Sequence, residues 1–252
     1  MKKLFLSLFI VASLCFNLRA DEGMWIPMLL QNNEQEMQEM GMNITVEDIY
    51  SINHSSMKDA VVLFDGGCTG EIVSDQGLLL TNHHCGFDWI QYHSTVEHDY
   101  LTHGFWAMSK EEELPCPGIS AVMLKSMEDV TERVLEGVTK ETSNDERAEI
   151  VTANIKKIKE EAEANSDYQV IIKSFYHGNK YYMIYNEVFK DVRMVGAPPS
   201  NIGKFGGDTD NWVWPRHTGD FSVFRIYVSP DGKAADYSED NVPYKPNYHF
   251  PI

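Results

Sequence analysis

The sequence predicts a mainly β protein that carries one helical insert. Apolar and polar residues alternate from Phe221 to Val228, which is the pattern of a half-buried strand. Earlier in the chain, a turn at Asp75 to Gly77 joins two apolar stretches and predicts a β-hairpin. Between these two regions, residues from about 127 to 165 are highly charged and lack strand alternation, so they favour helix. One helical segment set between strands is therefore the expected architecture.

The first twenty residues have the composition of a secretory signal peptide. Lys2 and Lys3 precede an apolar run from Leu4 to Leu18, and the small residue Ala20 suits a cleavage site. We expect cleavage near Ala20, so that residues 21–252 form the mature chain and the protein is periplasmic or secreted. No later run reaches the roughly 20 apolar residues that a membrane span needs, and we expect no span.

The mature chain should begin with a packed helical arm from residue 21 to about residue 50. Met37, Met40 and Met42 recur among polar residues at helical spacing. Methionines in this pattern are expected to fill the core rather than to hold a cofactor.

The hairpin is expected within Asp59 to Thr81. Gly77 supplies the positive φ that a short turn needs, and glycines around Cys68 permit a bulge or a close backbone approach. His83 and His84 follow where the second strand ends, at the rim of the apolar body of the hairpin. A histidine there can titrate near neutral pH while it is held rigidly.

The charged segment that follows should contain two helices. Val130, Val134 and Val138 are spaced by four, and residues 147–164 contain neither proline nor glycine. Beyond it, apolar alternation returns and predicts further strands. Outside the hairpin, the expected strands are 119–125, 168–172, 180–185, 188–195 and 221–228, with a loop at 196–218 that is rich in glycine, proline and aspartate.

The chain is strongly acidic. Its formal net charge is −17, and loss of Lys2, Lys3 and Arg19 with the signal would make it −20. This charge argues against nucleic acid or an anionic membrane as a partner. It fits an exported soluble protein and gives no information about the substrate.

The segment around the hairpin also carries the most specific motif. A glycine-flanked cysteine opens the hairpin, and Thr81 to Cys85 reads Thr-Asn-His-His-Cys after it. This arrangement resembles the way chymotrypsin-like serine peptidases present their catalytic histidine. Two further segments, Asp21 to Trp25 and Gly206 to Phe221, resemble the bacterial dipeptidyl-peptidases of the type 7 and type 11 group. The resemblance covers nearly the whole mature chain.

The resemblance implies a chymotrypsin-like β-barrel, the first of a double-barrel peptidase, in a chain truncated before the second barrel. It also implies a disulfide between Cys68 and Cys85, which leaves Cys116 unpaired, and export makes that bond chemically reasonable. The implied activity is serine-dependent removal of N-terminal dipeptides from oligopeptides with a free N-terminus. No cofactor is expected, and a homodimer of the intact protein is compatible with the family.

His84 and Asp220 are the expected catalytic residues. A serine hydroxyl needs an imidazole as general base and an acid that holds the correct tautomer. The family pattern places the base next to the bonded cysteine, at His84, and the acid at the end of Arg-His-Thr-Gly-Asp, at Asp220. Without that pattern, a structural role for either residue would be the simpler interpretation. Asp208 and Asp210 are rival acids, although turn residues of this type usually stabilise loops.

His83 should face away from His84 if the segment is extended, because strand side chains alternate.

The resemblance assigns substrate binding to Asn211 and Trp212. The amide would bind the α-ammonium group of the peptide, and the indole would wall the second subsite. Arg216 either lines the same pocket or pairs with one of the many acids. Trp214 is expected to pack the loop rather than to bind.

The nucleophile is expected beyond Ile252. After Asp220 the chain has only Ser222, Ser229 and Ser238, and none has the glycine-flanked setting that forms a backbone oxyanion hole. We therefore expect this chain alone to be inactive.

Two alternatives stay open. The chain could be an exported peptide-binding protein without catalytic activity, or a metal-binding module. Zinc accepts histidine and cysteine, but His93, His98 and His103 step by five and do not stack on one helical face. We therefore assign no metal site.

Overall fold

The computed structural model describes residues 25–251 and divides into two units, one ending at Asn43 and the other running from Ile44 to Ile252. In the first unit, the described part holds the 3-10 helix η1 (Pro27–Asn32) and the helix α2 (Glu34–Glu39). The expected helical arm is thus present as short separate pieces. The prediction that Met40 faces the core is wrong, because its side chain is 65% exposed. The predicted signal peptide lies outside the described residues.

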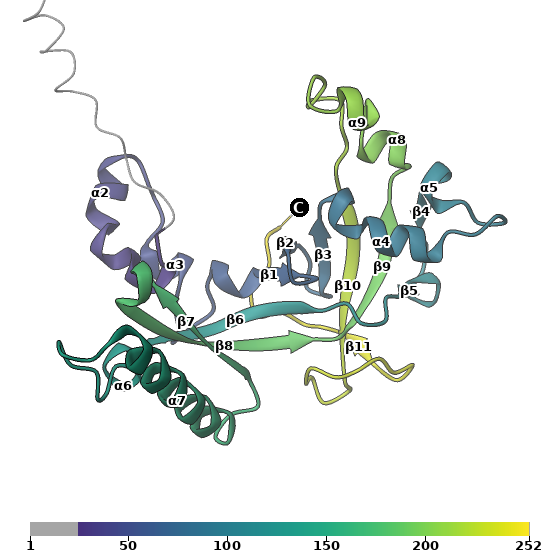
Figure 1. Ribbon diagram of the computed structural model, residues 1–252. Helices are drawn as coiled ribbons and strands as arrows, with labels where there is room; N and C mark the ends of the chain where they lie inside the picture. Colours follow the sequence, from purple (N-terminus) through teal and green to yellow (C-terminus); the bar gives the residue numbers. More distant parts are fainter. Residues whose placement is uncertain (1–24, 252) are drawn as a thin grey trace, which may run out of the picture. The chain divides into compact units, whose positions relative to one another are not determined.

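The second unit is built on a mostly antiparallel sheet with several helices (Figure 1). The main path of the sheet runs β4-β9-β10-β3-β2-β1-β6-β8-β7, with β11 beside β10 and β5 beside β9. The strands are β1 (Val61–Phe64), β2 (Cys68–Ile72), β3 (Leu78–Thr81), β4 (Phe105–Trp106), β5 (Leu114–Pro115), β6 (Ala121–Asp129), β7 (Gln169–Phe175), β8 (Lys180–Phe189), β9 (Asp191–Ala197), β10 (Ser222–Val228) and β11 (Val242–Pro243).

The helices of this unit are mostly short. They are α3 (Val46–Ile49), η2 (Met57–Ala60), α4 (His83–His93), α5 (Tyr100–His103), η3 (Lys110–Glu112), α6 (Thr131–Val134), α7 (Asn144–Glu163), η4 (Tyr176–Gly178), α8 (Ser200–Gly203) and α9 (Gly207–Asp210). Among residues 25–251, no helix has the length and apolar character that crossing a bilayer requires.

The mainly β class is confirmed, but the expected closed barrel is not. The sheet begins at β4 and ends at β7, and within the described residues these two strands do not pair with each other. Beyond β6 the path continues through the long hairpin of β8 and β7.

The predicted hairpin is present as β2 and β3. Glu71 lies opposite Leu80 and Ile72 opposite Leu79. Gly77 has a φ of +67°, and a Cβ there would lie 2.9 Å from the Ile226 carbonyl oxygen. The turn therefore needs glycine both for its backbone angle and for its contact with β10.

The main core lies against the hairpin and its neighbouring strands. Phe64 on β1 and Phe224 on β10 are fully buried, with ring centroids 4.7 Å apart. Ile90 on α4 belongs to the same cluster. Burial of these side chains fixes α4 on the sheet, and it is the first turn of α4 that carries the two adjacent histidines.

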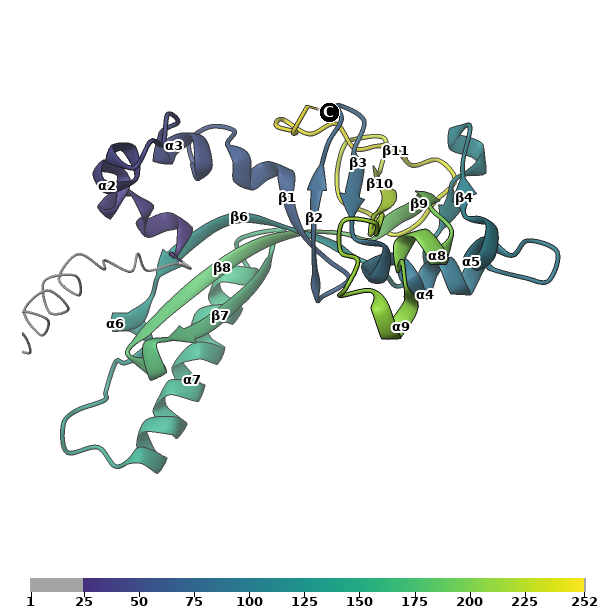
Figure 2. The same ribbon diagram turned by 90° about the horizontal axis from the view of Figure 1, so that it is seen from above.

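The helical insert differs from the prediction at its start. β6 continues to Asp129, so Met127–Asp129 are strand rather than helix, because each pairs with a residue of β8. Two helices follow, as predicted, but α6 is only four residues long. α7 begins with a capping box between Ser143 and Glu146, and its buried residues Val151 and Ile158 pack in a second core cluster with β7 and β8. Figure 2 shows α7 lying along these two strands.

Candidate active site

The two adjacent histidines begin a helix. The segment is not extended, which was the condition for the predicted orientation of His83: Asn82 is the N-cap of α4 and His83 its first residue. The strand ends because the apolar residues of β3 stop at Thr81, and the Gly86 amide N–H donates to the Asn82 carbonyl oxygen as the helix starts. Successive helical residues point about 100° apart, so the two rings still face different surroundings. His83 is buried and His84 is exposed.

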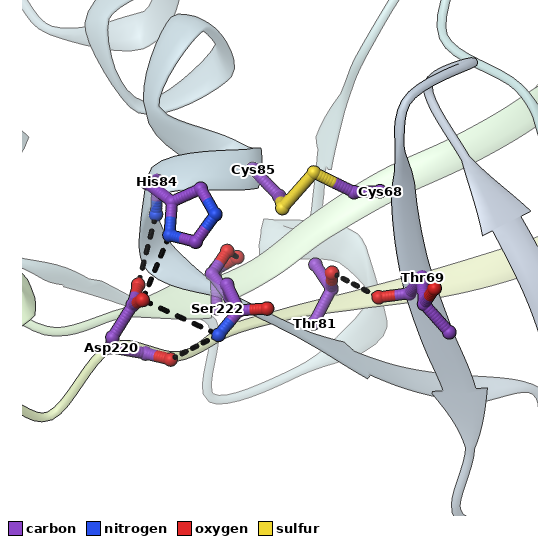
Figure 3. The surroundings of a disulfide bond; sticks show 8 residues. Cys68, Thr69, Thr81, His84, Cys85, Asp220 and Ser222 are labelled. Atoms are coloured by element: carbon purple, nitrogen blue, oxygen red, sulfur yellow. Dashed lines mark hydrogen bonds and ion pairs between the residues drawn. A yellow bond between two sulfur atoms is a disulfide. The ribbon is translucent and has the colours of Figure 1, made fainter. Parts of the chain in front are cut away.

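His84 and Asp220 are in direct contact (Figure 3). The distance from His84 Nδ1 to Asp220 Oδ2 is 2.8 Å, and the backbone N–H of His84 donates to Oδ1 at 3.1 Å. A carboxylate only accepts hydrogen bonds, so Nδ1 carries the proton and Nε2 has a free lone pair when the ring is neutral. Two contacts from one residue fix the ring relative to the acid.

Asn82 and Ser222 hold this pair in place, and the sequence analysis missed both roles. The Asn82 side-chain amide donates to Asp220 Oδ2 at 3.3 Å and to the Asp220 carbonyl oxygen at 3.2 Å. The Ser222 hydroxyl donates to the Asn82 carbonyl oxygen at 2.7 Å. An asparagine directly before a helix is a common N-cap, and that signal could have drawn attention to Asn82.

The rival acids lie elsewhere. Asp208 pairs with Lys204, which lowers the pKa of its carboxyl group through the hydrogen bond and the charge of the lysine. Asp210 ends the short helix α9 and is exposed. Of the three candidates, only Asp220 contacts His84 among the described residues.

Cys68 and Cys85 form a disulfide, with a Cα–Cα distance of 6.1 Å. The bond joins the start of β2 to the first turn of α4, next to His84 (Figure 3). These two sulfurs and a ring nitrogen of His84 lie within 4.8 Å of one another. Because the sulfurs are bonded to each other, they are not thiolates and cannot serve as zinc ligands.

Cys116, His93 and His98 do not belong to any group of possible metal ligands among the described residues. Cys116 is a free buried thiol, and burial raises its pKa to about 12. The His93 ring bonds to the Pro115 carbonyl oxygen, and the His98 ring stacks on Tyr100. These contacts favour structural roles.

His83, next to His84 in the chain, lies in a tight environment. Its side chain is 2% exposed, and a Cβ on Gly203 would lie 2.3 Å from its Cγ. Burial lowers the pKa of His83, so the neutral ring is favoured. Its Nε2 has no hydrogen-bond partner within the described part of the chain.

A pocket of about 710 Å³ opens beside His84. Its wall is shared by α4 and the segment that leads from α8 to Asp220. The lining residues include His83, His84, Phe87, Asp88, Ser200, Asn201, Gly203, Lys204, Asn211 and Asp220.

The predicted substrate-binding residues are only partly gathered at this pocket. Asn211 lines it, and its Oδ1 accepts from the Thr218 hydroxyl at 2.8 Å. Trp212 and Arg216 do not line it, and the Trp212 side chain is 79% exposed. Trp214 is about half exposed and contacts the His217 ring edge-on, so its predicted packing is partial.

The three serines after Asp220 do not line the pocket. Ser222 is buried and its hydroxyl bonds to backbone. The Ser229 hydroxyl contacts Asp231 and the Lys233 carbonyl oxygen within a turn, and Ser238 Oγ accepts from the Asp240 amide. None of them is placed to act as a nucleophile towards His84.

Comparison with known proteins gives consistent matches. The family model described as Peptidase S46 matches residues 20–252. An Asp/Glu-specific dipeptidyl-peptidase of Flavobacterium psychrophilum is 54% identical over 99% of this chain and 35% of its own length. A dipeptidyl-peptidase 7 of Porphyromonas gingivalis is 51% identical over 91% of this chain and 32% of its own. The chain thus spans about a third of the length of the curated relatives it matches.

Solved structures agree with these matches. The crystal structure of DPP11 from Porphyromonas endodontalis aligns with a TM-score of 0.80 and 48% identity, over 91% of this chain and 33% of that one. The same protein in complex with the dipeptide Arg-Glu aligns with a TM-score of 0.79 and 49% identity, over 91% of this chain and 35% of that one.

Proposed function

The chain belongs to the peptidase S46 family, and from this premise we propose that the protein is a serine-type dipeptidyl-peptidase that releases N-terminal dipeptides from oligopeptides. The observation that carries the proposal is the contact between His84 Nδ1 and Asp220 Oδ2 at 2.8 Å, beside an open pocket. A base held by an acid in this way is what activation of a hydroxyl nucleophile requires.

The geometry supports a two-step acyl transfer. His84 Nε2 accepts the proton of a serine hydroxyl while the serine oxygen attacks the carbonyl carbon after the second residue of the peptide. The imidazolium then gives this proton to the leaving amine, and an acyl-enzyme remains. In the second step His84 takes a proton from water while the water oxygen attacks the ester carbon. The ester C–O bond then breaks, the imidazolium returns its proton to the serine oxygen, and the free dipeptide leaves. Asp220 stabilises the imidazolium in both steps.

The nucleophile is proposed to lie outside these 252 residues, since the chain spans 35% of a relative that it matches over 99% of its own length. On this view the chain supplies the base, the orienting acid and part of the peptide pocket. The serine and the groups that stabilise the oxyanion come from the rest of the protein.

We also propose that β1, β2, β3, β10, β9 and β6 correspond to the first barrel of a chymotrypsin-like peptidase. Only Lys190 separates β8 from β9. The end of β8 pairs with β6 at Ala121, while the start of β9 pairs with β10 at Tyr227. One bent strand thus borders both β6 and β10, which is the connection that a six-stranded barrel needs.

For the substrate, Asn211 is the proposed contact for the α-ammonium group, because it lines the pocket together with His84. Trp212 and Arg216 are proposed to approach the peptide from the exposed loop that follows. Relatives named Asp/Glu-specific dipeptidyl-peptidase are 49 to 54% identical, and those named dipeptidyl-peptidase 7 are 46 to 51% identical. Substrates with acidic and with uncharged second residues therefore both belong in the assay.

Export to the periplasm or beyond the cell is the proposed location, with the mature protein starting near residue 21. The disulfide between Cys68 and Cys85 supports it, because such bonds persist in oxidising compartments.

The test uses the full-length protein and fluorogenic dipeptidyl substrates. We expect hydrolysis that an N-acetyl group abolishes and that an organophosphate blocks. His84→Ala should lower kcat by roughly a thousandfold or more. His103→Ala, which changes an exposed histidine outside the pocket, is the matched control. An active His84→Ala variant, or a wild-type protein without dipeptidyl-peptidase activity, would overturn the proposal.

A further inference from the structure

One wall of the pocket beside His84 presents three polar groups without a partner in the described residues. They are the Asp88 carboxylate, the buried Nε2 of His83 and the buried hydroxyl of Ser200. Buried polar atoms are nearly always hydrogen-bonded in folded proteins, so two such atoms in one pocket wall indicate that a ligand or a water completes them.

Nε2 of His83 is a hydrogen-bond acceptor. Hydrogen bonding to the backbone of Pro198 affects this ring, and it must involve Nδ1 because Nε2 has no partner. Burial lowers the pKa of His83 and keeps the ring neutral, so Nε2 has a lone pair and no proton. The ring is 2% exposed and held by Gly203, so it cannot turn to find another donor.

Asp88 adds a negative charge next to this acceptor. It lies four residues after His84 on α4, and residues with this spacing share one face of a helix. The other acidic and basic side chains of the pocket already have partners. Asp220 is bound to His84, and Lys204 is bound to Asp208, which does not line the pocket. Among residues 25–251, Asp88 is therefore the charged side chain on this wall that lacks a partner, and its neighbour His83 Nε2 accepts hydrogen bonds.

We propose that Asp88, His83 Nε2 and the Ser200 hydroxyl form a cation subsite, which binds a positively charged nitrogen of the first residue of the peptide. The inference rests on the proposed function. Asn211, the proposed contact for the α-ammonium group, lines the same pocket, and a dipeptidyl-peptidase has only two residues to place before the cleaved bond. The cation is either the α-ammonium group, present in every substrate, or the side chain of a first-position lysine or arginine. Both offer several N–H donors and one positive charge.

The experiment distinguishes these two sources. Fluorogenic dipeptides with one fixed second residue carry lysine, norleucine or glutamate at the first position, so that lysine and norleucine differ chiefly in the ammonium group. For a side-chain cation, Asp88→Asn should lower the lysine-to-norleucine ratio of kcat/KM about fivefold, which equals about 1 kcal/mol at 1.4 kcal/mol per tenfold change. For the α-ammonium group, Asp88→Asn should lower kcat/KM about fivefold for all three substrates.

Two further variants sharpen the result. Asp88→Lys reverses the charge, and for a side-chain cation it should make the glutamate substrate better than the norleucine substrate. Glu97→Gln removes the same charge from an exposed residue outside the pocket and should leave kcat/KM unchanged. If Asp88→Asn has no more effect than Glu97→Gln, the cation subsite is wrong. The fluorogenic substrates have no residue after the cleaved bond, so a cation that binds on the leaving-group side would give this negative result.

Equilibrium binding of the free Lys- and norleucine-containing dipeptides, measured by calorimetry, separates this inference from the proposed function. If the protein hydrolyses none of the substrates, but Asp88→Asn lowers its affinity for the dipeptides about fivefold, the cation subsite is supported and the proposed peptidase function is wrong. If the protein hydrolyses the substrates, but Asp88→Asn changes neither hydrolysis nor binding, the cation subsite is wrong and the proposed peptidase function is supported. Absence of both hydrolysis and binding overturns the two together.

Discussion

The disulfide between Cys68 and Cys85 should supply a measurable part of the stability around the contact between His84 and Asp220. Its two residues are 17 positions apart, and closing a loop of that length in the unfolded chain is worth about 3 kcal/mol. The same bond joins β2 to the turn of α4 that carries His84. We therefore expect its removal to lower the free energy of unfolding by about 3 kcal/mol. Faster hydrogen exchange in the first turn of α4 should accompany this loss.

The assay compares the oxidised protein with a Cys68→Ala/Cys85→Ala variant by chemical denaturation. Tryptophan fluorescence follows unfolding, and hydrogen exchange follows the amides of α4. Reduction of the wild-type protein is the control and should reproduce the effect, because Cys116 is already a free thiol. A loss below about 1 kcal/mol, with unchanged exchange in α4, would refute the reasoning.

Three further predictions concern the residues that hold the histidines. Asn82→Ala should lower kcat roughly tenfold with little change in KM, because Asp220 loses the amide that donates to it; steady-state kinetics test this, and an unchanged kcat contradicts it. Gly203→Ala should destabilise the fold by about 1–3 kcal/mol, since its Cβ would lie 2.3 Å from His83 Cγ; a denaturation midpoint equal to that of the wild type would show that the ring gives way freely. Stability should fall as the pH drops below 6.5, because burial lowers the pKa of His83 from that ordinary value and the unfolded chain binds a proton that the folded one does not. Burial also lowers the pKa of His93. His83→Gln should therefore reduce the difference between the melting temperatures at pH 7.5 and 5.5 without abolishing it. An undiminished difference would show that His83 does not cause the pH dependence.

Local sequence patterns predicted the strands well where hydrophobic alternation and turn residues agree. The hairpin with its turn before Leu78 and the strand β10 are both present close to their expected bounds. The long strand β6 was predicted too short, since Met127–Asp129 begin a charged, helix-permissive stretch but pair with β8. A pairing partner more than fifty residues away decides that conformation, and local propensity cannot reveal it.

The contact between His84 and Asp220 was predicted through a resemblance, and it needs tertiary structure to be seen. Asp88 and Ser200 carried no pattern in the sequence. The helix α4 places Asp88 on the same face as His84. The helix α8 brings Ser200 into the pocket, and its Gly203 packs against the buried ring of His83. No helix start was predicted after Thr81, so the sequence did not indicate this wall of the pocket.

The most direct test of the account is a structure of the full-length protein inhibited by a dipeptidyl phosphonate. We predict a phosphonylated serine whose oxygen lies within hydrogen-bond reach of His84 Nε2, while Nδ1 stays bonded to Asp220. A modified serine whose neighbouring base is another residue, with the His84 ring turned away from it, would contradict the role of His84 in catalysis.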